Sequence, residues 1–285
     1  MTIIKEHPPR LKIHTNGKGK LIFLLCLVGL LLLFAAFGGL MTQHDPYKTN
    51  LSTALLPPSS EFPFGTDNLG RSVLSRVLAG AATSIFSALA VVIIVFVLGL
   101  TLGIIAGYVG GVVDIVIMRI TLIFQAFPGF ILAICVAAML GTGLVNGIIS
   151  LSIVYWTTYA RLGRSLVLSI KNSTYIKAAK MCGAGKWSIM VKYICPNVVS
   201  PVIVTAALDV GNVILSMAGL SFLGLGAARP TAEWGAMMSE ARAFLQTGPW
   251  GIIFPGIALF GVVILFNLLG DAICDTIDAK RVKED

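Results

Sequence analysis

Long blocks of apolar residues, separated by shorter polar stretches, dominate the chain. A helix that crosses the hydrocarbon core of a bilayer needs about 20 mostly apolar residues. Six candidate blocks follow one another, at residues 21–41, 81–108, 112–140, 146–160, 198–220 and 251–274. The pattern predicts an all-α, polytopic membrane protein with about six transmembrane helices.

The first and third apolar blocks depart from a simple membrane-spanning helix. The first, residues 21–41, could be a secretory signal, but the apolar core of a signal peptide spans only about 7–15 residues. A retained span is therefore favoured. The third block is long and contains Pro128. Proline lacks the backbone N–H of a helix interior, so a kink or break is expected there.

Composition agrees with a membrane environment. Of the 285 residues, 56% are hydrophobic and 12% are charged, whereas soluble domains carry about 25% charged residues. That is too little polar surface to cover a soluble body of this size. A soluble domain is therefore excluded.

The net charge of +8 is distributed unevenly. Basic residues concentrate on the cytoplasmic side of membrane proteins. With the N-terminus inside, all but five of the 21 basic residues fall in inner segments. The five exceptions are Lys48, Arg71, Arg76, Arg229 and Arg242. Both termini are therefore predicted to be cytoplasmic, and the positive charge requires no nucleic acid.

Few residues suggest chemistry within the chain. The five cysteines are scattered without a CxxC pair, which disfavours a metal site or a disulfide framework. The GAGK at residues 183–186 lacks the first glycine and the final Ser/Thr of a phosphate-binding loop. We therefore expect no catalytic, cofactor-binding or metal-binding residues, and no enzyme activity in this subunit.

The inner segment, residues 161–196, is longer than a helix connection needs. One helix-like apolar stripe consists of Ile176, Ala179, Met181 and Cys182, and a second consists of Trp187, Ile189, Met190, Tyr193 and Ile194. Gly183 lies between them and can end a helix in a left-handed turn. Two interpretations are open: an amphipathic pair on the membrane surface, or a lever that inserts into a cytosolic partner.

Asp209 lies within the fifth block, where a charge costs about 2.5–3.5 kcal/mol on insertion scales. Asn212 and Ser216 share its helical face. This polar stripe could line a translocation path for a cationic or amine-bearing solute, or it could form hydrogen bonds with another span.

Other positions have simpler interpretations. A face of small residues, Gly99, Gly103 and Gly107, predicts close packing against another helix. Asp114 and Arg119 are expected to be solvated or paired end charges. Outside the membrane, Glu233, Trp234 and Arg242 could contact a receptor, form an outer gate or fold their loop.

Five sequence motifs resemble those of a known family. Ala178-Ala179, Gly183 and Pro196-Asn197 are similar to the EAA loop of binding-protein-dependent ABC importer permeases, with Lys177 at the usual Glu position and Tyr193 at a common His position. The other motifs resemble signatures of the C-type subunits for oligopeptides, dipeptides and nickel. They are FGTDNLGR at 64–71, LSFLGLG at 220–226, PTAEWG at 230–235 and FNLLGD at 266–271.

The resemblance spans residues 64–278 and implies a type I importer permease fold in a bacterial inner membrane. It also implies a heterodimer with a second permease, two cytoplasmic ATPase subunits and an extracytoplasmic solute-binding protein. The expected cargo is nickel, a metal chelate, or a di- or oligopeptide. The expected ATPase contacts are Lys177, Ala178, Ala179, Gly183 and Ala184.

The resemblance also implies a domain organisation. Residues 1–80 form a cytoplasmic tail, the first span and a periplasmic loop. Residues 81–278 form a five-helix core with a coupling loop at 165–196, and residues 279–285 form a second cytoplasmic tail. The alternative functions are a stand-alone secondary transporter of a small cationic solute and a channel. The first would need a coupling-ion site and the second a filter-like repeat, and neither is visible in the sequence.

Overall fold

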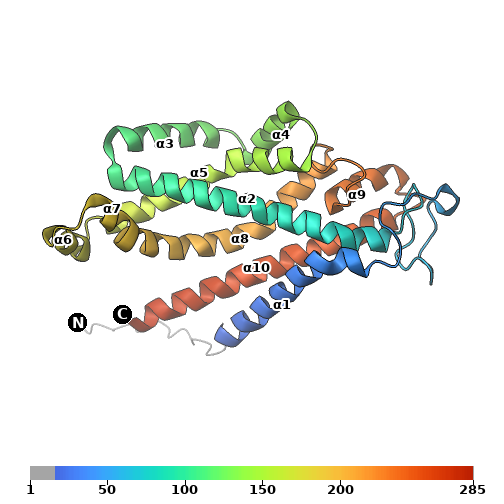
Figure 1. Cartoon of the computed structure of the whole chain (residues 1–285), viewed down its shortest axis with the longest axis horizontal. Coiled ribbons are helices and arrows are strands. Elements are labelled where there is room, and N and C mark those ends of the chain that lie inside the picture. The colour runs from blue at the N-terminus through green and yellow to red at the C-terminus, as the bar shows by residue number, and fades with distance from the viewer. Residues whose placement is uncertain (1–16, 285) are drawn as a thin grey trace, which may run out of the picture.

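A computed structural model describes residues 17–284, with side chains described from residue 18 to residue 276. Lys5, Arg10 and Lys12, which the sequence predicts to be cytoplasmic, lie outside the described residues. Figure 1 shows an elongated bundle of helices with α6 at one end and α9 at the other. The described chain contains no strand, so the predicted all-α class is confirmed.

Long helices form the body of the bundle. They are α1 (Gly17–Phe37), α2 (Val73–Val109), α5 (Leu144–Ile170), α8 (Cys195–Phe222) and α10 (Trp250–Glu284). The short helix η1 (Gly38–Met41) continues α1 to the end of the first candidate span. The first loop on the side expected to face outward carries η2 (Leu51–Thr53), and the second carries α9 (Trp234–Ala241) and η4 (Arg242–Phe244). The inner connection consists of α6 (Thr174–Met181), α7 (Lys186–Ile189) and the π-helical turn η3 (Met190–Ile194).

By length and composition, four helical stretches among the described residues could cross a membrane: Lys18–Met41, Val73–Val109, Lys186–Phe222 and Trp250–Thr276. Counting one bent pair as a single span gives five. Helix α5 has 27 residues but is not among these candidates. It packs between α2, α4 and α8, where its polar residues can meet other helices.

The third predicted span is not one continuous helix. It consists of α3 (Gly111–Gln125) and α4 (Gly129–Leu140), which meet at an angle of 90°. Pro128 stands directly before α4. Proline has no N–H to donate and disfavours the helical conformation in the residue before it. The expected kink is therefore a complete break.

Glycines on α2 allow its backbone to pack closely against α5. A Cβ at Gly99 or Gly103 would collide with the backbone of Trp156 or Ala160 on α5, and one at Gly107 would lie 2.8 Å from Val167 Cβ. The predicted smooth face of α2 is therefore confirmed as a packing surface. It also places α5, which leads into the inner connection, tightly against the longest helix of the bundle.

Candidate functional site

The inner connection forms a helical hairpin, and its first helix, α6, ends in the left-handed turn that the sequence predicts at Gly183. Gly183 has a φ of +82°, in the left-handed region that favours glycine. The N–H of Ala184 donates to Ala179 O at 3.0 Å and that of Gly183 donates to Lys180 O at 3.0 Å. These bonds satisfy carbonyls at the end of α6, so the hairpin has a defined shape.

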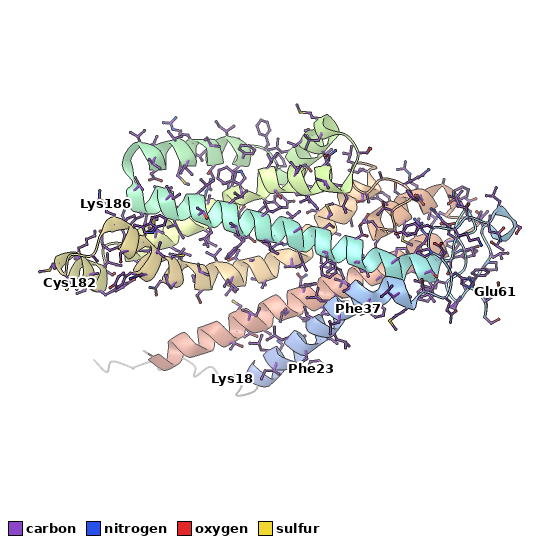
Figure 2. All side chains as sticks on the ribbon, viewed as in Figure 1. Lys18, Phe23, Phe37, Glu61, Cys182 and Lys186 are labelled. Atoms are coloured by element: carbon purple, nitrogen blue, oxygen red, sulfur yellow. The ribbon has the colours of Figure 1, made fainter. Side chains whose placement is uncertain are left out.

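The two faces of this hairpin differ in burial. Ile176, Ala179 and Ile189 are buried. Large apolar side chains point outward instead, with Met181 89% exposed and Trp187 73% exposed. Figure 2 shows Cys182 and Lys186 at the end of the molecule opposite Glu61. An exposed apolar surface of this kind indicates a contact with another molecule.

The five predicted ATPase-contact residues do not share one face. Lys177, Ala178 and Gly183 are exposed, and Ala184 is half-buried. Ala179 faces inward beside Ile176. The sequence prediction did not include Met181 and Trp187 in this set, although both belong to its apolar stripes.

The polar stripe on α8 faces α5. Tyr159 donates its hydroxyl hydrogen to Asp209 Oδ2 at 2.8 Å. One turn earlier on α5, the Tyr155 hydroxyl lies 3.1 Å from Ser216 Oγ. Of the three predicted stripe residues, Asn212 is exposed, whereas Asp209 and Ser216 are half-buried. Asp209 therefore has the interhelical partner that an acid within a span requires.

Tyr155 and Tyr159 are not among the site residues predicted from the sequence. Their spacing of four residues puts them on one face of α5, which is a usable signal. Nothing in the local sequence, however, indicates which helix that face meets.

Buried ion pairs hold the outer end together. Arg71 is 2% exposed; its Nε lies 2.6 Å from Asp67 Oδ2 and its Nη2 lies 2.7 Å from Glu240 Oε2. Arg229, whose side chain is 76% exposed, reaches the same Glu240 carboxylate from outside at 3.0 Å. These contacts fasten the first outer loop to α9.

Glu233 caps the start of α9. Its carboxylate accepts hydrogen bonds from the N–H groups of Gly235 and Ala236 at 3.0 and 2.8 Å and from the Ser84 hydroxyl at 3.2 Å. Burial raises the pKa of Glu233 above its ordinary value, while these hydrogen bonds act in the opposite direction. Glu233 thus holds its own loop, whereas Arg242 is exposed.

Trp234 joins the same outer contact through its indole N–H, which donates to Val77 O at 3.0 Å. The indole is buried between α9 and the start of α2. Of the three interpretations open for this segment, loop folding therefore accounts for both Glu233 and Trp234.

No cluster of three His, Cys, Asp or Glu side chains that could hold a metal ion occurs among the described residues. The cysteines at 26, 135 and 182 are exposed. What the described structure offers is a packed helical bundle with an interhelical polar contact and an outward-facing hairpin.

The chain matches the family model described as "Binding-protein-dependent transport system inner membrane component" over residues 99–283. It is 40% identical over 260 residues to the nickel transport system permease protein NikC of Escherichia coli K12, covering 91% of this chain and 94% of that protein. It is 42% identical over 261 residues to the dipeptide transport system permease protein DppC of Alkalihalophilus pseudofirmus, with 90% and 86% covered. Glutathione permease GsiD of E. coli O6 is 45% identical over 223 residues, with 78% and 74% covered.

The fold is similar to that of the methionine ABC transporter MetNI in an inward-facing conformation. The TM-score is 0.57 at 18% identity, covering 69% of this chain and 94% of that chain. The fold is therefore that of a type I importer permease.

Together, the helical bundle and these likenesses define the class as an ABC importer permease. The chain belongs to the family of inner membrane components of binding-protein-dependent transport systems, in agreement with the C-type subunits for oligopeptides, dipeptides and nickel. It is a multi-pass membrane protein. Permease components of this class are not themselves enzymes; they work with separate ATPase subunits and a binding protein.

Proposed function

We propose that this chain forms half of a translocation pathway with a second permease subunit, and that α6, Gly183 and α7 dock into a cytoplasmic ATPase subunit. The observation that carries the proposal is the exposure of Met181 and Trp187 on a hairpin whose inner face is fixed to the bundle. A lever needs both properties: an outer surface for the partner and a firm attachment to the helices that it moves.

The hairpin is attached to the bundle by buried contacts at both helices. Ile176 and Ile189 are 0% and 1% exposed, and both belong to the main apolar core. Exposed basic residues surround the outward face, including Lys177, Lys180 and Lys186. A hairpin lying flat on a membrane would bury its large apolar side chains in lipid. A docked hairpin would bury the same side chains against the ATPase subunit, so an experiment that finds which of the two covers them separates the alternatives.

For the cargo, we propose nickel, a metal chelate, or a di- or oligopeptide, in keeping with the named cargo of the relatives. The polar stripe of Asp209, Asn212 and Ser216 supports a cationic or amine-bearing solute. Asn212 is exposed, and Tyr159 orients the carboxylate of Asp209. In this proposal both termini are cytoplasmic, as the basic residues indicate.

Gly183 and Gly185 offer a matched test of the docking hairpin. Both have open space around an added Cβ, but Gly183 has a φ of +82° whereas Gly185 has a φ of −69°. A left-handed conformation costs a side chain roughly 1–2 kcal/mol, which corresponds to about a tenfold change in population. Gly183→Val should therefore lower transport by about that factor, and Gly185→Val should not.

The measurement is uptake of radioactive Ni²⁺ and of a tritiated dipeptide in cells, with the amount of inserted permease determined in parallel. We expect both variants to insert normally. Full uptake by Gly183→Val, together with full ATPase stimulation in the purified complex, would contradict the assignment of the hairpin.

A further inference from the structure

An ion pair joins α3 to α5 near the hairpin end of the bundle. The Arg164 guanidinium contacts both carboxylate oxygens of Asp114, with Nη2 at 2.7 Å from Oδ2. The side chains are 32% and 18% exposed. A bidentate pair of this kind fixes the orientation of the guanidinium relative to the carboxylate as well as the distance between them, and it is stronger than a neutral hydrogen bond. The bundle therefore has a defined joint at this point.

The link from α2 to α3 is otherwise loosely packed. Gly110 and Gly111 have φ values of +72° and +56°, and no atom lies within 4 Å of an added Cβ at either position. Two successive glycines with open surroundings leave the direction of α3 weakly determined by its connection to α2. Contacts made by α3 itself must determine it.

Besides packing on α2, α3 is held at both of its ends by contacts with α5. Near the start, Asp114 binds Arg164. Near the end, Gln125 Nε2 lies 3.4 Å from Thr157 Oγ1, and Phe124 packs edge-on against Trp156 with ring centroids 6.3 Å apart. Figure 1 shows α3 leading into α4 on one side of the bundle. Helix α3 is thus fastened along α5 and should follow its displacement.

Helix α5 connects this joint to the hairpin without interruption. It continues to Ile170, and Lys171 donates from Nζ to Gly107 O at 3.0 Å, one of the last carbonyls of α2. Helix α6 begins three residues later. On its other side, α5 carries Tyr159, the partner of Asp209. One continuous helix therefore contacts the polar stripe and α3, and it leads through a short turn into the hairpin.

We propose that Asp114 and Arg164 are positioning residues that transmit movement of the docking hairpin through α5 to α3 and α4. This proposal rests on the proposed function, because it takes the hairpin as the ATPase contact. The pair does not meet the cargo or the nucleotide; it sets the geometry by which one moving element displaces another. Without it, ATP hydrolysis should continue while α4 no longer responds.

Two native cysteines provide separate reporters. Cys135 is exposed on α4, and Cys182 is exposed in the hairpin. In the complete complex with its ATPase subunits, the other cysteines are replaced so that only one reporter remains. Its rate of labelling by a small membrane-permeant maleimide is then measured with and without ATP. A second α4 reporter is Met139→Cys, at a residue that is 87% exposed.

With Asp114 and Arg164 intact, we expect ATP to change α4 labelling by roughly fivefold or more, as for a typical coupling between sites. Asp114→Asn and Arg164→Gln should each abolish that change while the ATPase subunits stay bound and hydrolysis continues. The exchange Asp114→Arg with Arg164→Asp should restore it. Arg161→Gln is the control, because Arg161 is exposed on the same helix and forms no ion pair with any described residue.

The two reporters distinguish the two proposals. If the ATPase subunits fail to protect Cys182 in the complex with Asp114 and Arg164 intact, the proposed function itself is wrong. If Cys182 is protected but α4 labelling ignores ATP, or responds equally in Asp114→Asn and Arg164→Gln, the joint is overturned. Loss of the response in the single variants and its return in the exchange variant supports the joint when the ATPase subunits stay bound and hydrolysis is unchanged in every variant, because a folding defect would lower those two readouts as well.

Discussion

At the outer end of the bundle charged side chains are buried against one another, whereas at the hairpin end large apolar side chains face outward. Arg71 is 2% exposed and meets two carboxylates of the same chain. Met181 is 89% exposed and meets none of the bundle's core. The outer end pairs its buried charges within the chain, although Arg76 Nη2 makes no hydrogen bond there. The hairpin end leaves a surface that only another molecule can cover.

This difference indicates where each end obtains its stability. The outer loop and α9 lie far apart in sequence, yet they form a single unit through residues such as Arg71 and Glu240. The hairpin depends on local helix-capping bonds and on a few buried contacts such as Ile176. Substitutions should therefore act on folding at the outer end and on assembly at the hairpin.

The largest effect is expected for Arg71→Ala. Removing one member of a buried ion pair costs about 3–5 kcal/mol, and the upper limit applies here only in part because Arg76 still lies 3.6 Å from Asp67 Oδ2 and 3.7 Å from Glu240 Oε2. The matched control is Arg229→Ala, which contacts the same Glu240 carboxylate from an exposed position and should cost about 0–1 kcal/mol. Thermal unfolding and the amount of protein in detergent measure both. Equal stability of the two variants would contradict the buried network.

A smaller effect is expected at two tryptophans with different surroundings. Trp234→Phe removes the indole N–H that donates to Val77 O and should destabilise the protein by about 1–3 kcal/mol. Trp187→Phe, at a residue 73% exposed, should stay within roughly 0.5 kcal/mol. Trp187→Asp should leave stability unchanged but weaken retention of the ATPase subunits on purification. Unaltered retention would argue against a docking role for this face.

The smallest expected effect is the change of the unfolding temperature with pH that Glu233 causes at the outer end. Because burial raises the pKa of Glu233 in the folded state above 4.5, the folded protein holds the proton more tightly than the unfolded chain. The stabilising contribution of this group is therefore complete below about 4.5 and is lost as pH rises through the raised value. The unfolding temperature should fall more steeply with pH in the natural sequence than in Glu233→Gln. Parallel profiles would show that Glu233 does not titrate there.

Much of the fold could be predicted because hydropathy alone determines where long helices cross a bilayer. The sequence predicts the helices less well where polar residues form contacts between helices. The polar part of α5, residues 161–170, was assigned to a loop on the strength of its arginines. It is helical because α2 offers a glycine face and Asp114 offers Arg164 a partner. Pro128 signalled a break, but the angle of 90° depends on packing that no local pattern encodes.

The candidate site was predictable to a similar degree. The left-handed turn at Gly183 follows from local chemistry, and the structure confirms it. The partner of Asp209 cannot be predicted from local chemistry, because Tyr159 is 50 residues away in sequence. The ion-pair network at the outer end is even harder to predict from the sequence, since Arg71 and Glu240 are separated by 169 residues. Long-range pairs of this kind require the fold before they can be identified.

Crosslinking from Cys182 tests the central claim most directly. Cys182 lies exposed at the tip of the hairpin, and Cys26, exposed on α1, serves as the control position. Single-cysteine permeases carrying one or the other are assembled with the second permease and the ATPase subunits, and then treated with a short thiol-to-amine crosslinker. We predict a covalent adduct between Cys182 and an ATPase subunit and none from Cys26. An assembled, transporting complex in which Cys182 forms no such adduct and stays freely reactive would contradict the account.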